Sequence, residues 1–212
     1  FVLTLQTGEL DIAADDVLGQ IDFQAPDEAT GTDAILVAAG ISAISEGDFS
    51  TSNNATKLSF KTGASAAATE KMYITSTGNV NMKNTATGDD TPMVLTLQTG
   101  ETDIAAADKL GVINFQAPDE ATGTDAVLIA AGIEAVSEGD FSSSNNATKL
   151  SFKTAASGVA AETASLSSTG VFSATSFTGS GAGLTAGTTP LATLDIDGGT
   201  DIGEAIVDAD LF

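Results

Sequence analysis

The chain contains one sequence unit twice. Residues 53–62 recur as residues 145–154, a separation of 92 residues. Residues 1–80 align on residues 93–172 without a gap, and 58 of the 80 aligned positions are identical. Solenoid repeats have periods of roughly 20–50 residues. A period this much longer indicates a small domain or fibre segment that is used twice in tandem.

The repeat divides the chain into five parts. We expect repeat 1 over residues 1–84, a linker over 85–92, repeat 2 over 93–172, a strand and Gly-rich turn over 173–190, and the truncated start of a further module over 191–212. Both ends of the chain are apolar and there is no initiator Met. We therefore expect an internal segment of a longer protein.

Short segments in which apolar and polar residues alternate predict β-strands, separated by turns rich in Gly, Asn and Asp. They lie at residues 3–6, 19–24, 57–62, 72–75 and 80–82. Residues 34–39 are a continuous apolar run that Gly40 interrupts, and we favour a buried strand there over a short helix. Strands at roughly ten-residue spacing are typical of an all-β unit.

The alternation also predicts which side chains point inward. Leu58 and Phe60 are expected inside, whereas Lys57, Ser59 and Lys61 are expected outside. Ile21 and Phe23 share one face of their strand in the same way. The full set expected to be buried comprises Ile21, Phe23, Leu58 and Phe60 with their counterparts Ile113, Phe115, Leu150 and Phe152.

Composition limits the core that one chain can build. The hydrophobic fraction is 42%, but much of it is Ala, which buries little surface. An acidic chain rich in Gly, Ser, Thr and Ala is compatible with disorder, yet the alternating segments argue against it. A homotrimer would share a small core between chains and cover the strand edges. We expect an all-β, elongated tandem-repeat fibre segment, an intertwined or side-by-side homotrimer of short strands, β-prism-like or β-helix-like.

Charge excludes several kinds of partner. The formal net charge is −22, and the seven basic residues are all Lys. Nucleic-acid binding requires Lys and Arg to neutralise phosphates, and anionic membrane surfaces attract basic segments. No apolar run approaches the roughly 18 residues that span a bilayer. We expect no nucleic acid partner and no membrane insertion.

Catalysis has few residue types available. The chain lacks His and Cys, which excludes a His-based triad and a Cys nucleophile, and a Ser–Lys dyad has no sequence marker. Paired carboxylates could serve a glycosidase. However, such pairs in Gly-rich turns are typical of exposed loops, and an enzyme rarely needs one site twice in tandem. The pairs are Asp27/Glu28, Asp119/Glu120, Glu46/Asp48 and Glu138/Asp140.

Three further motifs are interpreted as turns or chance matches. Residues 195–201 resemble a calcium loop but have Gly199 at the fifth position and Ile206 at the twelfth, so a turn is favoured and Ca²⁺ binding stays open. Residues 179–183 lack the Lys-Ser/Thr of a P-loop. Residues 54–56 and 146–148 match the short glycosylation pattern. We assign no catalytic residue, metal ligand or cofactor.

Several segments taken together resemble a known group of proteins. Residues 3–6, 19–23, 54–62 and 72–80 resemble repeats in tail-fibre and related virion structural proteins of phages, especially marine phages such as cyanophages. Residues 176–185 and 194–203 are similar to turn and downstream segments of the same proteins. The resemblance implies trimeric, β-rich fibres outside the particle, and it carries over no catalytic residues.

We therefore expect a structural shaft or spacer segment of a phage virion, located on the particle exterior within a host-attachment apparatus. Its expected partners are other copies of the chain, other virion proteins and, through a distal module, a host cell-surface glycan. The alternatives are a receptor-binding or glycan-degrading tail spike and a bacterial extracellular adhesin or filament subunit. A single Tyr and no Trp disfavour a carbohydrate site, and we expect no enzymatic activity.

Overall fold

The described part of the chain is all-β, as expected from the sequence. The computed structural model describes residues 1–26, 31–118, 123–176 and 178. It comprises two compact units, Phe1–Thr96 and Leu97–Phe212, each containing one five-stranded antiparallel sheet. Among these residues the only helix is the 3₁₀ turn Asp125–Val127.

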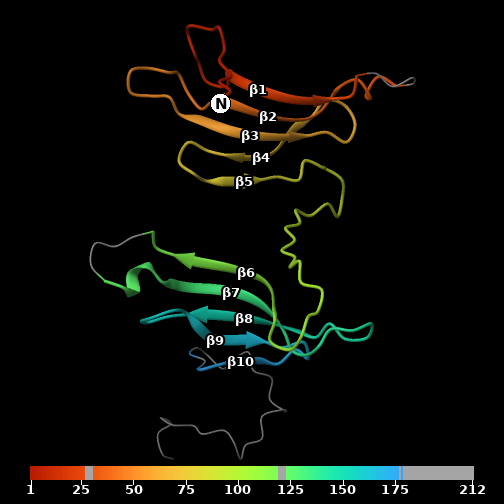
Figure 1. Cartoon of the computed structure of the whole chain (residues 1–212), viewed down its shortest axis with the longest axis vertical. Helices are drawn as coiled ribbons and strands as arrows, with labels where there is room; N and C mark the ends of the chain where they lie inside the picture. The colour runs from red at the N-terminus through yellow and green to blue at the C-terminus, as the bar shows by residue number, and fades with distance from the viewer. Residues whose placement is uncertain (27–30, 119–122, 177, 179–212) are drawn as a thin grey trace, which may run out of the picture. The chain divides into compact units, whose positions relative to one another are not determined.

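The first sheet is a simple meander in which consecutive strands are neighbours, in the order β1-β2-β3-β4-β5 (Figure 1). Polar segments such as 46–55 and the Gly78 turn, where Gly78 has a positive φ of 84°, reverse the chain between strands. The strands are β1 (Val17–Gln24), β2 (Val37–Ser45), β3 (Thr56–Thr62), β4 (Thr69–Ile74) and β5 (Val80–Met82).

The second sheet has the same topology, with the order β6-β7-β8-β9-β10 along the chain. Every strand boundary lies 92 residues after its counterpart, as 109 − 17 and 172 − 80 illustrate. The register shifts coincide as well, including those after Phe60 and Phe152. The strands are β6 (Lys109–Gln116), β7 (Ile129–Ser137), β8 (Thr148–Thr154), β9 (Ala161–Leu166) and β10 (Phe172–Ala174).

The strand register separates each sheet into an apolar face and a polar face. Residues that are paired across the strands point to the same side of the sheet. Two apolar rows of the first sheet are Ile21, Ile41, Phe60, Met72, Met82 and Gly19, Ala43, Leu58, Ile74, Val80. The row between them on the other face is Gln20, Ser42, Ser59, Tyr73, Asn81.

The predicted alternation is therefore confirmed, whereas burial of these side chains stays a prediction for the assembled protein, because the single chain leaves most of them exposed. The exposed fractions are 44% for Ile21, 55% for Phe23 and 41% for Leu58, and the counterparts in repeat 2 have 44%, 54% and 39%. Phe60 and Phe152 are half-buried. The reason is that each unit contains a single sheet, so the unit has no second layer of its own to cover the apolar face.

Small polar side chains are buried instead. Ser59, which the sequence placed outside, has an exposed fraction of 0%, and its cross-strand partner Ser42 has 1%. Both lie on inner strands, where the longer side chains of neighbouring rows screen a short hydroxymethyl group from water. Strand alternation predicts the face of a residue, whereas the size of its neighbours decides how much water reaches it.

Two segments differ from the predicted strands. Strand β2 starts at Val37 and continues through Gly40 to Ser45, so Gly40 does not interrupt it. Residues 3–6 form no strand. Instead, Leu5 packs on Gly19, where an added Cβ would lie 2.7 Å from the Cβ of Leu5. The absence of a side chain at Gly19 allows the N-terminal segment to approach strand β1.

The same contact recurs in repeat 2. A Cβ added at Gly111 would lie 3.0 Å from the Cβ of Leu97. We call residues 1–8 and 93–100 the strap segments. They are identical in sequence except at their first residue, Phe1 or Met93.

Candidate functional site

The most prominent surface feature is the apolar face of each sheet. In the first sheet it carries three Ile, two Met, Leu, Phe and Val in register. Monomeric proteins rarely expose a large contiguous apolar surface, and such a surface marks an interaction site. The apolar faces are therefore the candidate functional sites of this chain, and they suit association.

Each apolar face contains a hollow next to its strap segment. In repeat 1 the hollow has a volume of about 210 Å³ and lies where the small residues Gly19 and Ala43 are paired. In repeat 2 it has a volume of about 280 Å³. The two hollows are built from equivalent positions: Leu5, Leu18, Gly19, Gln20, Ile21, Ile41, Ala43 and Leu58 in one, and Leu97, Leu110, Gly111, Val112, Ile113, Ile133, Ala135 and Leu150 in the other.

The polar face of repeat 2 contains a buried carboxylate between two cations. Glu134 Oε1 lies 2.8 Å from Lys109 Nζ and 2.8 Å from Lys153 Nζ, and the Glu134 side chain is 7% exposed. Burial raises the pKa of Glu134, but the hydrogen bonds and charges of Lys109 and Lys153 outweigh burial and hold that pKa below its ordinary value. Glu134 therefore remains ionised as a structural ion pair.

Repeat 1 has different residues at two of these three positions. Val17 and Ser42 stand where repeat 2 has Lys109 and Glu134, and Lys61 corresponds to Lys153. The hydroxyls of Ser42 and Ser59 have no hydrogen-bond partner within the described residues. Sequence reasoning missed this cluster, although the paired change of Val to Lys and Ser to Glu between the repeats was a usable signal.

The polar face of repeat 1 also carries the single Tyr of the chain. Lys57 Nζ lies 3.3 Å from Glu70 Oε2 and 5.3 Å from the centre of the Tyr73 ring. The ring is thus occupied by a cation within its own sheet. The equivalent of Tyr73 in repeat 2 is Ser165, so this arrangement belongs to one repeat alone.

The candidate carboxylates Glu46 and Glu138 hold loops together. Glu46 accepts a hydrogen bond of 3.0 Å from the backbone N–H of Ser76, and Glu138 accepts one of 2.9 Å from Ser168. Hydrogen bonds from the side chains and backbones of these two serines lower the pKa of both carboxyl groups. A catalytic general acid needs a raised pKa, so the environment of these groups is the opposite of what acid catalysis requires.

Asp48 and Asp140 also serve loop structure. Asp48 Oδ1 accepts a hydrogen bond of 3.3 Å from the backbone N–H of Ala14, and Asp140 Oδ1 accepts one of 3.2 Å from Ala106. Within each of the predicted pairs Glu46/Asp48 and Glu138/Asp140, the Glu and the Asp thus bind different loops. The arrangement matches the solvated-turn interpretation that the sequence favoured.

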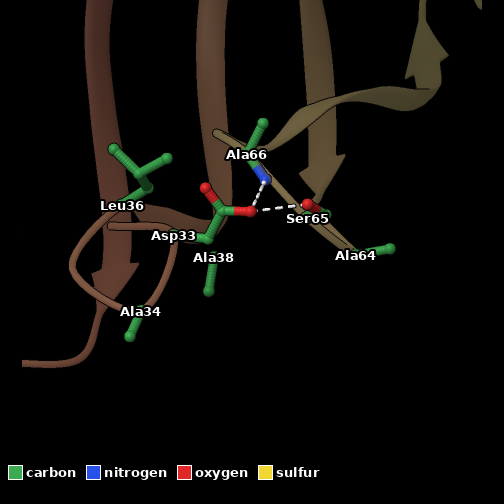
Figure 2. A pocket seen from close by; sticks show the side chains of 8 residues that line it. Asp33, Ala34, Leu36, Ala38, Ala64, Ser65 and Ala66 are labelled. Atoms are coloured by element: carbon green, nitrogen blue, oxygen red, sulfur yellow. Dashed lines mark hydrogen bonds between the residues drawn. The ribbon is translucent and has the colours of Figure 1, made fainter. Parts of the chain in front are cut away.

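Figure 2 shows a small pocket of repeat 1 in which another carboxylate, that of Asp33, joins two loops. Asp33 Oδ2 accepts hydrogen bonds of 2.5 Å from Ser65 Oγ and 3.1 Å from the Ala66 N–H, which lower the pKa of Asp33. In repeat 2, Asp125 Oδ2 accepts hydrogen bonds from the equivalent residues Ser157 and Gly158. Half of the residues that line the pocket are Ala, and these offer little for ligand recognition.

The remaining sequence candidates lie outside the described residues. They are the pairs Asp27/Glu28 and Asp119/Glu120, the Gly-rich residues 179–183 and the calcium-like residues 195–201. Within the described ranges no group of three or more His, Cys, Asp or Glu side chains is placed to hold a metal ion. A search of the same residues finds no helix with the length and apolarity needed to cross a membrane.

Comparison with known proteins gives structural neighbours alone. No family model matches the chain, and no curated protein matches it. One similar structure is the carboxy-terminal domain of the bacteriophage T5 L-shaped tail fibre, with a TM-score of 0.38, 10% identity and coverage of 93% of each chain. Another is the same domain with its intramolecular chaperone domain, with a TM-score of 0.36, 11% identity and coverage of 97% of this chain and 68% of that chain. Because the TM-scores and identities are low, we base no argument on these two similarities.

Proposed function

We propose that this chain is a shaft segment of a phage fibre, in which copies of the chain pack through their apolar faces. The observation that carries the proposal is a duplicated sheet whose apolar side is open in the single chain. A closed assembly of three copies would bury these faces and cover sheet edges. We propose that the fibre lies on the exterior of the virion and is joined to other virion proteins.

The duplication supports a role in length. Repeat 2 reproduces each strand of repeat 1 at a constant offset, and a repeated unit lengthens a fibre without requiring a new surface. Exposed loops carry small and acidic residues, whereas binding hot spots are rich in Trp, Tyr and Arg. We propose that host recognition, including contact with a surface glycan, belongs to another module.

We also propose that the segment has no hydrolytic activity. The support comes from Glu46 and Glu138, whose carboxylates accept backbone hydrogen bonds and have lowered pKa values. This environment disfavours a role of Glu46 and Glu138 as the general acid of a glycan-degrading spike. A bacterial surface filament would use the same apolar packing and remains the second candidate.

In-frame deletion of residues 1–92 tests the shaft role, because Met93 then replaces Phe1 at an equivalent position. Electron microscopy of the purified assembly should show a rod that is shorter by one repeat, and a variant with a third copy of the repeat should give a longer rod. Particles of the parent phage that carry the deletion should still adsorb to the same host. Compact particles of unchanged length, or correctly assembled phage without adsorption, would overturn the proposal.

A further inference from the structure

We propose that the hollow in each apolar face is the seat for a Phe side chain of a second copy of the chain. Phe23 of the neighbouring copy enters the hollow at Gly19 and Ala43, and its Phe115 enters the hollow at Gly111 and Ala135. The inference rests on the proposed assembly and names the contact through which its apolar faces meet.

The hollow has the size and lining that an aromatic ring requires. Its volume is about 210 Å³ in repeat 1 and about 280 Å³ in repeat 2. A cavity of about 150 Å³ lined by Leu, Ile and Phe accepts benzene. Leu5, Ile21, Ile41 and Leu58 supply an apolar lining in repeat 1. Transfer of an aromatic ring from water into an apolar hollow of this size is favourable, because apolar surface of both the ring and the hollow is removed from water.

The occupant must be available in both repeats because the hollow occurs in both. Phe23 is 55% exposed and its counterpart Phe115 is 54% exposed. The other exposed Phe side chains of the described residues are Phe1 and Phe172, whose counterparts are Met93 and Val80. Phe23 and Phe115 are therefore the exposed aromatic pair that both repeats share.

Phe23 cannot fill the hollow of its own sheet. The cross-strand partner of Phe23 is Ala39, and that of Gly19 is Ala43. Four residues along strand β2 separate these positions by about 13 Å. The side chain and the hollow thus lie at different places on one face.

Two different patches that fit one another make a heterologous contact. Such contacts generate a ring when the rotation between copies closes. If three sheets form the sides of a prism, the end of strand β1 in one copy, where Phe23 lies, meets the beginning of strand β1 in the next copy, where Gly19 lies. This brings Phe23 of one copy to the hollow of its neighbour. The placement of the two patches on the sheet therefore fits a closed threefold arrangement.

Cross-linking tests the contact directly, because the chain contains no Cys. The double variant Phe23→Cys/Ala43→Cys of the full chain is treated with a thiol-specific bifunctional reagent that is shorter than the separation within one chain. We expect covalent dimers and trimers on a denaturing gel. The control Phe23→Cys/Asn81→Cys, whose second thiol lies on the polar face, should stay monomeric on that gel. Equal cross-linking of both pairs, or none of the first pair, would contradict the contact.

Filling the hollow gives an independent test. In Ala43→Leu/Ala135→Leu the added atoms enter the hollow of the same chain, so circular dichroism should remain that of a β-protein while the assembled fraction measured by sedimentation falls at least tenfold. Asn81→Leu is the control on the polar face and should assemble normally. A trimeric wild type with an equally trimeric Ala43→Leu/Ala135→Leu variant overturns this contact alone. A monomeric wild type overturns the proposed assembly as well.

Discussion

At the scale of single residues, the most informative difference between the repeats is the buried ion cluster of repeat 2. We predict that Glu134→Ser destabilises repeat 2 by about 1–3 kcal/mol, because removing a buried partner leaves the desolvated Lys153 without its acceptor. The Nζ atoms of Lys109 and Lys153 each lie 2.8 Å from the same oxygen of Glu134. Urea unfolding at fixed protein concentration measures the change.

The matched control is Glu134→Ser/Lys109→Val, which installs the residues that repeat 1 has at these positions, Ser42 and Val17. This double variant should be more stable than Glu134→Ser, because it removes the repulsion between the two neighbouring cations that lose their shared carboxylate. Such non-additivity is the signature of interacting sites. A single variant with wild-type stability would show that the cluster contributes nothing measurable.

The lowered pKa values of Glu46 and Glu138 predict a dependence of stability on pH. A carboxyl group with a lowered pKa in the folded state stabilises the fold above its ordinary value of 4.5, and this contribution is lost as the pH falls through the lower folded-state pKa. The stability difference between wild type and Glu46→Gln/Glu138→Gln should therefore be largest near neutral pH and shrink below pH 4.5. A difference that stays constant over this range would refute the assignment.

Single residues also show where sequence reasoning reaches its limit. The alternation around Ser59 correctly predicted the face of the sheet on which Ser59 lies. Its side chain is nevertheless fully buried, because neighbouring strands supply longer side chains. Those neighbours come from β2 and β4, and a local sequence pattern does not show which strands will pair. The cluster around Glu134 was missed for the same reason, since its three members come from three strands.

At the scale of structural elements, the strap segments depend on two glycines. We predict that Gly111→Val loosens residues 93–100, because its Cβ would lie 3.0 Å from the Cβ of Leu97, although Val is enriched in strands. Limited proteolysis should cut this segment several-fold faster than in the wild type. Gly100→Val is the control, since no atom lies within 4 Å of a Cβ added at Gly100.

Cleavage of Gly111→Val at the wild-type rate would mean that the strap is not held by this contact. The strap also marks a failure of the alternation rule. Residues 3–6 have the period of a strand, yet they form none in the structure. Conversely, β2 continues through Gly40, because pairing with strands on both sides outweighs the weak intrinsic preference of Gly.

At the scale of the whole molecule, the alternating segments correctly predicted that the described residues are all-β, and the repeat correctly predicted that the two copies share strand boundaries. Burial could not be predicted from one chain. Ile21, Phe23 and Leu58 have the pattern of core residues but are exposed in the single chain. Their pattern is consistent with a core that forms between chains, as the proposed function requires.

The native mass of the purified 212-residue chain tests this claim most directly. Sedimentation equilibrium or native mass spectrometry should give three times the chain mass of 21.1 kDa, and the trimer should persist on dilution because it buries the apolar faces. A well-folded chain that remains at 21.1 kDa at all concentrations, with its β-structure intact, would contradict the proposed trimer.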